Sequence, residues 1–265
     1  MSAAETPTRA DTAAQRSATH IDSDTIERGM VTQTVTGPVA ALAMLRLASP
    51  SLPIGGFSYS QGLEPAIVAG WVADEQSLVD WLGSLIDSSL ASYEAPLCWR
   101  LFGALRSRHI RAALHWHEDF LASRETAELR AETLQMGYSL LKLLTDTHDA
   151  SGWIAPMARK RLADRRETAL PLAFGMAALA FGIDRPAALQ AYAWTWLENQ
   201  VAAAIKAVPL GQQCGQRVFD ALLPRLGAAL EQAPHRRETD WSNFTPGLAL
   251  ASSWHETQYS RLFRS

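Results

Sequence analysis

Apolar residues recur three and four positions apart along most of this 265-residue chain, and no segment alternates apolar and polar residues for long. The three-to-four spacing places apolar side chains on one face of an α-helix, whereas a half-buried strand requires a period of two. Ala and Leu also greatly outnumber Val and Ile. The sequence therefore predicts an all-α fold, a single-domain helical bundle of about nine or ten helices over residues 38–265.

Capping residues and prolines divide this pattern into helices. Pro50 ends the first helix, because a residue before proline avoids the α region, and Asp74 and Asp184 are expected N-caps. Ser123 is expected to cap the long helix that follows it, and Pro96 to break or kink the helix that begins at Asp74. Residues 184–208 carry apolar side chains on more than one side, which predicts the centre of the bundle.

The first 37 residues are rich in Ala, Thr, Ser, Asp and Arg and contain few large apolar residues. Such a segment cannot bury enough apolar surface to offset the entropy lost on ordering. We therefore predict a disordered N-terminal arm over residues 1–37, which can be removed without loss of folding.

Charge, cysteine content and the length of apolar runs limit the partners and the compartment. The 24 Lys and Arg residues against 27 Asp and Glu give a net charge of −3, which argues against a general affinity for nucleic acid or anionic membrane. Cys98 and Cys214 lie far apart and match no disulfide framework or zinc motif. No apolar run approaches the roughly 20 residues that span a bilayer, and no secretion signal is recognisable. We expect a cytoplasmic protein with no nucleic-acid or membrane partner.

The enzyme motifs that this sequence partly matches each lack residues that their chemistry requires. The stretch "GGFSYSQG" lacks the Lys-Ser/Thr of a phosphate-binding loop and the strand-to-helix elbow of a nucleophilic serine. Ser139 and Lys142 have the spacing of a Ser-x-x-Lys pair, but they lie on a heptad-patterned helix without the companion motifs. We expect no catalytic residues, no cofactor and no enzymatic activity.

The segment "HWHED" is the richest group of metal-ligating side chains. His115 and Asp119 stand four residues apart on a helix, so both could reach one nickel or zinc ion, whereas His117 and Glu118 point elsewhere. A solvated helix face is the simpler interpretation, and we assign no metal site, with His115 and Asp119 as the candidates if one exists.

The stretch "SPSLPIGGFSYSQGLE", residues 49–64, has the composition of a shaped loop. Gly55 and Gly56 can adopt positive φ and allow close backbone approach, and Phe57 and Tyr59 are aromatic anchors. These four residues are expected to bind a partner or to brace the C-terminal tail.

Two further segments carry residue types that are typical of interfaces. "VPLGQQCGQ" places Gln212 and Gln216 in an expected loop, where their amides could bind a partner or cap a helix. The ending "HETQYSRLFRS" contains Tyr259, Arg261 and Arg264. On a helical tail the two arginines would share a face, while Leu262 and Phe263 would dock the tail onto the bundle.

Four segments together resemble the urease accessory protein UreF family. They are "LASPSLPIGGFSYSQGLEPAIVAGWV", "SRETAELRAETLQMGYSLLKLL", "VPLGQQCGQRV" and "HETQYSRLFRS", in the family's order from about residue 40 to the end. Two departures are local: Gln213-Cys214 stands where the family commonly has Thr-Asp, and Trp254 stands where Arg is common. The first departure puts in doubt any role that needs an acidic group at that position.

The resemblance implies an all-α, non-catalytic protein that forms a homodimer. It implies a complex with UreD (also called UreH) and the GTPase UreG on the urease apoprotein, where nickel is inserted into the active site. Two alternatives stay open at this point. The chain could activate the GTPase through Arg261 or Arg264, or it could bind nickel itself through His115 and Asp119.

Overall fold

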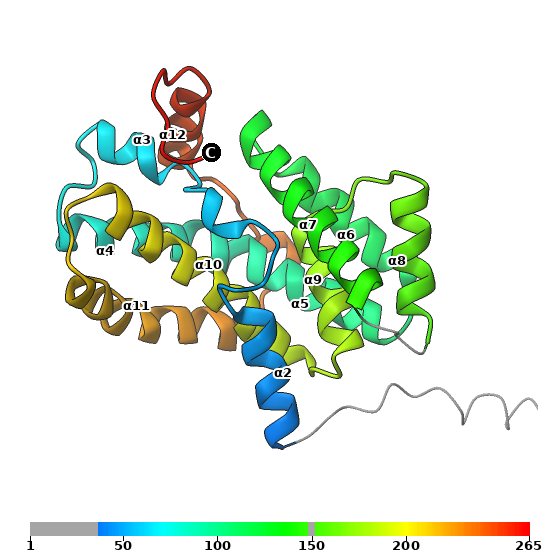
Figure 1. The fold of residues 1–265 in the computed structure, drawn as a ribbon. Helices are drawn as coiled ribbons and strands as arrows, with labels where there is room; N and C mark the ends of the chain where they lie inside the picture. The colour runs from blue at the N-terminus through cyan, green and yellow to red at the C-terminus, as the bar shows by residue number, and fades with distance from the viewer. Residues whose placement is uncertain (1–36, 148–151) are drawn as a thin grey trace, which may run out of the picture. The chain divides into compact units, whose positions relative to one another are not determined.

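The structure is a computed structural model that describes residues 37–147 and 152–265. Within these two ranges every regular element is helical and no strand occurs. The α-helices, labelled as in Figure 1, are α2 (Pro38–Ala48), α3 (Leu63–Val68), α4 (Glu75–Leu85), α5 (Ala95–Arg106), α6 (Ile110–Ala122), α7 (Ala127–Thr147), α8 (Ile154–Ala163), α9 (Leu170–Ala180), α10 (Arg185–Ala207), α11 (Gln212–Gln232) and α12 (Pro246–Glu256). All of them except α3 have at least ten residues, so the predicted all-α bundle of nine or ten helices is confirmed.

The predicted N-terminal arm lies outside the described residues, apart from Gly37. In the part of the chain that is described, no helix is both long and apolar enough to cross a bilayer.

Helices α9 and α10 form the centre of the bundle. Every residue of α9 from Pro171 to Leu179 is buried, as an almost uniformly apolar sequence requires. Helix α10 packs against α2, α3, α5, α9 and α11, and Leu197 and Val201 in it are inaccessible to solvent (Figure 1). The predicted central position of this segment is confirmed, including its Asp184 cap, whose carboxylate accepts a hydrogen bond from Ala187 N–H.

The chain stays helical through Pro96, so of the predicted break or kink the break is wrong. A π-helical segment, η2 (Ile86–Glu94), joins α4 directly to α5, and Pro96 lies in the first turn of α5. Proline has no N–H to donate, and in a regular α-helix its ring clashes with the carbonyl group four residues earlier. The wider turn of the π-helical segment gives this carbonyl group room, so the helix continues.

The N-cap of α7 is Thr126 and not Ser123. Leu129 N–H donates to Thr126 Oγ1 at 3.2 Å, while Ser123 closes the C-terminal end of α6 and donates to Phe120 O. Both residue types can cap a helix, so the choice depended on where α6 ended.

Helix α7 lies against the start of α9 at a glycine. A Cβ atom on Gly137 would stand 1.9 Å from the carbonyl oxygen of Thr168, so only glycine permits this approach. The contact leaves the adjacent face of α7, with Thr133 and Met136, turned towards the site described next.

Candidate partner-binding site

The loop between α2 and α3 owes its shape to three residues with positive φ. Gly55 has φ 79°, Gln61 has φ 52° and Gly62 has φ 77°, and a short 3₁₀ turn, η1 (Gly56–Ser58), lies between them. No described atom lies within 4 Å of a Cβ placed on Gly55, so its need for glycine is conformational and no close approach occurs there. Gly56 has an ordinary φ, and its nearest neighbour would be Met136 Sδ at 3.7 Å.

The C-terminal tail runs beside this loop and is bonded to it through the main chain (Figure 1). Arg264 N–H donates to Ser58 O at 2.8 Å, and Ser60 N–H donates to Ser265 O at 2.8 Å. The tail is irregular after α12 ends at Glu256, so the predicted helical tail is wrong. The loop therefore braces the tail, but through the main chain of Ser58 and Ser60 and not through the side chains of Phe57 and Tyr59 that were expected to do so.

Glu64, the acidic residue of α3, holds the tail through hydrogen bonds. Its buried carboxylate accepts hydrogen bonds from the main-chain N–H groups of Leu262 at 2.8 Å and Phe263 at 2.9 Å, and from Gln258 Nε2 at 2.9 Å. Hydrogen bonds to an ionised acceptor are stronger than neutral ones. One carboxylate thus fixes the path of three tail residues.

Glu132 makes a second anchor, deeper in the molecule. It accepts hydrogen bonds from Gln61 Nε2 at 2.5 Å and from Ser265 Oγ at 2.8 Å. Burial raises the pKa of Glu132 to about 7, although both hydrogen bonds act in the opposite direction. Gln61 is also bonded to Gln200 of α10, so loop, tail and central helix share one polar network.

The side chains of the tail have different environments. Arg261 is engaged within the chain, since Nη1 lies 2.8 Å from Glu128 Oε1 and Nη2 donates to Glu256 O at 2.7 Å. Tyr259 is fully exposed, and Arg264 is exposed and makes no side-chain hydrogen bond or ion pair with the described residues.

Only one of the two apolar residues expected to dock the tail does so. Phe263 is buried, with Lys206 Nζ 5.4 Å from the centre of its ring. Leu262 is half exposed. The tail is irregular, and the direction of this side chain follows from the hydrogen bond of its N–H group to Glu64 and not from a helical period.

The two aromatic residues of the loop lie at different depths. Tyr59 is buried, and its carbonyl oxygen accepts a hydrogen bond from Asn199 Nδ2 at 2.9 Å. Phe57 is half-buried. Of the two expected anchors, Phe57 alone offers a solvent-facing surface in this structure.

Gln212 and Gln216 lie in the first turns of α11 and not in a loop. Gly211 is the N-cap, and both glutamines are exposed with no side-chain hydrogen bond inside the described part of the chain. Their amides are therefore free for a partner, and that role stays a prediction.

The predicted metal candidates are not brought together with a third ligand. Asp119 accepts a hydrogen bond from Tyr93 O–H at 2.9 Å, and the His115 ring packs on Trp116. Across residues 37–147 and 152–265, no three His, Cys, Asp or Glu side chains are placed to hold a metal ion.

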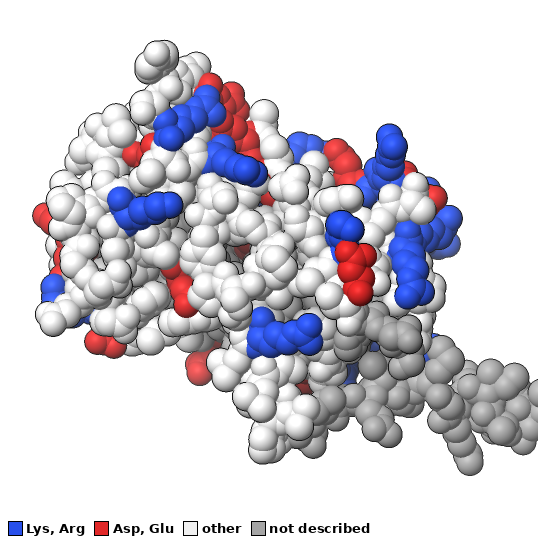
Figure 2. Space-filling view, in the orientation of Figure 1, with Lys and Arg blue, Asp and Glu red and all other residues white. Residues whose placement is uncertain are grey.

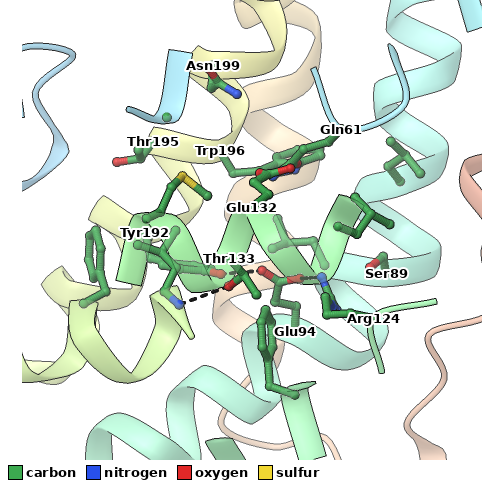
Figure 3. Close-up of a pocket in the computed structure, with 18 of the residues that line it drawn as sticks. Gln61, Ser89, Glu94, Arg124, Glu132, Thr133, Tyr192, Thr195, Trp196 and Asn199 are labelled. Carbon is green, nitrogen blue, oxygen red and sulfur yellow. Dashed lines mark hydrogen bonds and ion pairs between the residues drawn. The ribbon is translucent and has the colours of Figure 1, made fainter. Parts of the chain in front are cut away.

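A pocket of about 90 Å³, partly open to solvent, lies beneath the loop (Figure 3). Its polar groups largely satisfy one another: Tyr192 O–H donates to Glu94, and Arg124 Nη1 lies 3.5 Å from Glu94 Oε2. Asn199 also lines the pocket, and its Oδ1 atom is buried without a partner. Only the N–H₂ group of Asn199 is bonded, to the carbonyl oxygen of Tyr59.

The carboxylates of the site were not singled out by the sequence. Glu132 could have been found, because it lies three residues after Leu129 and four before Met136, so the three side chains share one face of a helix. Glu64 and Glu128 carried no such signal, since their partners are the tail residues some 130 to 200 positions away.

Comparisons with known proteins give one consistent result. The family model UreF matches residues 72–223. The chain is 50% identical over 236 residues to the urease accessory protein UreF of Azoarcus sp. (strain BH72), covering 89% of this chain and 100% of the relative. It is 46% identical over 222 residues to the protein of the same name from Dechloromonas aromatica (strain RCB), covering 84% and 96%. It is also 48% identical over 230 residues to the bifunctional urease accessory protein UreEF of Bordetella bronchiseptica, covering 84% of this chain and 51% of the relative.

Proposed function

The chain belongs to the UreF family of urease accessory proteins, and on this premise we propose that it is a non-catalytic adaptor for nickel insertion into urease. In this proposal it forms a cytoplasmic complex with UreD (UreH), the GTPase UreG and the urease apoprotein, and it is itself a homodimer. The bifunctional UreEF relative supports a role beside other accessory proteins, since a region similar to this chain occupies about half of that protein.

One observation carries the proposal: the main chain of residues 262–265 is fixed, while the exposed side chains of Tyr259 and Arg264 have no partner among the described residues. Glu64, Ser58 and Ser60 hold the backbone of residues 262–265. Tyr259 and Arg264 then face solvent without partners among the described residues. A binding segment that is already ordered loses less entropy on association, and Tyr and Arg are the residue types that dominate binding energy at interfaces.

Phe57, Gln212 and Gln216 extend the proposal beyond the tail. Each of these three residues offers groups that face solvent. Gly55, Gly56 and Tyr59 contribute indirectly to partner binding in this proposal, because they shape the loop that carries Phe57 and braces the tail. We assign these residues to partner binding, either by contact or by positioning.

Reconstitution tests the adaptor role. Purified chain, UreD and UreG should elute together on gel filtration, and the complex should activate the urease apoprotein in the presence of nickel. Tyr259→Ala and Arg264→Ala should each weaken the complex, whereas Arg108→Ala, an exposed residue at the α5–α6 turn, should not. If all three variants form the complex as well as wild type, Tyr259 and Arg264 do not bind the partners.

A second candidate function is supported by the state of Arg264. An activator of a GTPase can supply an arginine to the transition state, and such a residue must be free to enter the partner's site. Arg264 meets this condition, whereas Arg261 is held by Glu128. GTP turnover by UreG with wild-type chain and with Arg264→Ala separates this function from simple assembly: an adaptor leaves the rate unchanged in both cases.

A further inference from the structure

Four large apolar side chains, from α3, the segment that follows it and α12, form an exposed surface apart from the tail residues discussed above. Val68, Trp71, Leu250 and Trp254 are 73%, 40%, 51% and 44% exposed. The ring centres of Trp71 and Trp254 are 5.0 Å apart, and Trp71 also lies 6.0 Å from Trp81 of α4. We call these four residues the Trp71–Trp254 surface.

Rigid elements hold this surface in place. Leu250 and Trp254 are four residues apart on α12 and therefore share a face. Helix α12 packs against α3 so closely that a Cβ on Gly62 would stand 3.0 Å from Leu248 Cδ1. Exposed apolar side chains that gather around two indoles in contact mark an interaction site more often than a solvated face.

The segments that build this surface contain no cation. Residues 47–99, which include α3 and α4, have six acidic residues and neither Lys nor Arg, and residues 238–260, which include α12, have three acidic residues and neither Lys nor Arg. Glu75 and Asp87 are paired with arginines of α11, but Asp74 and Asp80 have no cationic partner in the part of the chain that is described. The carboxylate of Glu256 accepts from Ala127 N–H, while Arg261 donates to the main-chain carbonyl of Glu256. In Figure 2 the surface over α3 is largely uncharged, side chains of both signs lie over α12 and the tail beside it, and Lys and Arg gather over α8 on the other side of the view.

We propose that the Trp71–Trp254 surface docks an amphipathic, basic segment of a partner protein. The apolar side chains of that segment would cover the two indoles, and its Lys or Arg residues would face the carboxylates or lie over the indole rings. A second copy of this chain fits less well, because a two-fold contact would bring the same unpaired carboxylates together. The inference deepens the proposed function, on which it rests, and it uses none of the tail residues.

Opposite charges at one position test the partner's chemistry. Leu250→Lys and Leu250→Glu remove the same apolar contact at an exposed helical site where both new residues are good helix formers. With UreD, UreG and the urease apoprotein as separate probes, Leu250→Lys should weaken binding to one of them by about tenfold or more, and Leu250→Glu by about threefold or less. The same pair at Leu223, exposed on α11, should leave that affinity unchanged.

Each outcome decides a different point. If both Leu250 variants bind all three probes like wild type, the surface does not dock a partner. If Leu250→Lys and Leu250→Glu weaken binding equally, the docked segment is not basic. If the two variants instead change the oligomeric state of the chain without partners, the surface binds a second copy of this chain.

A synthetic amphipathic helix of leucine and lysine separates this inference from the proposed function. Its binding should quench tryptophan fluorescence of the wild-type chain and less that of Trp71→Phe, while a leucine–glutamate peptide should not bind. If the chain binds this peptide but none of the three proteins, the proposed function fails and the surface stands. If the chain does not bind the peptide either, both fail.

Discussion

The guanidinium of Arg261 lies 2.8 Å from the carboxylate of Glu128, across 133 positions of sequence. This pair ties the tail to the first turn of α7, and the other oxygen of Glu128 lies 2.6 Å from His255 Nδ1 in α12. Arg261 therefore already has a partner within the chain, and Arg264 does not.

Arg261→Ala and Arg264→Ala should consequently differ. Arg261→Ala removes a partly exposed ion pair and should lower the free energy of unfolding by about 0.5 to 1 kcal/mol. Arg264→Ala should leave the melting temperature unchanged and reduce partner affinity by about tenfold or more, if its guanidinium is buried at the interface. Thermal unfolding and pull-down of UreD and UreG measure the two effects, and equal behaviour of both variants would contradict the assignment.

Glu64→Ala should release the tail. The main-chain N–H groups of Leu262 and Phe263 would lose their acceptor, at a cost of about 2 to 3 kcal/mol for the tail's docking. Trypsin should then cut after Arg261 and Arg264 much faster than in wild type. Glu125→Ala, at an exposed position before α7, is the control and should not change the cleavage rate; a tail that stays protected in Glu64→Ala would show that other contacts suffice.

Glu132 should make stability depend on pH. Its folded pKa is about 7 and its ordinary value is 4.5, so between these values the folded state binds more protons than the unfolded state. The free energy of unfolding therefore falls as pH rises through this window, and the loss is complete above the folded pKa. Glu132→Gln cannot ionise, so urea unfolding at pH 5 to 8 should show wild type losing stability relative to this variant. A constant difference across the range would refute the raised pKa.

Gly137→Ala should destabilise the bundle strongly. Its Cβ would collide with the carbonyl oxygen of Thr168, a backbone atom that cannot move without shifting α9. We expect a loss of about 3 kcal/mol, at the upper end for overpacked cores. Gly227→Ala in α11 is the matched control, because no described atom lies within 4 Å of its Cβ, and it should gain up to about 1 kcal/mol from helix propensity. Urea unfolding of both variants measures the contrast.

Periodicity and capping chemistry were enough to predict the helices, because both are local. The stripe through Leu197 and Val201, the Asp74 and Asp184 caps and the end of α2 before Pro50 each depend on residues within about two turns. Where two local signals competed, the prediction failed: Ser123 and Thr126 could both cap α7, and Pro96 was tolerated because a π-helical segment precedes it.

By itself the sequence determined the all-α class and the central helix α10, and it predicted the segments of the candidate site, since helical period and loop composition depend on neighbouring residues. Only the tertiary structure decided how the side chains of those segments are placed and which of them have partners within the chain. It paired Arg261 with Glu128, buried Tyr59, left Arg264 free and placed Glu64 under the tail. These outcomes depend on contacts between residues more than a hundred positions apart, and a local pattern carries no information about which distant group will satisfy a buried charge or a free N–H.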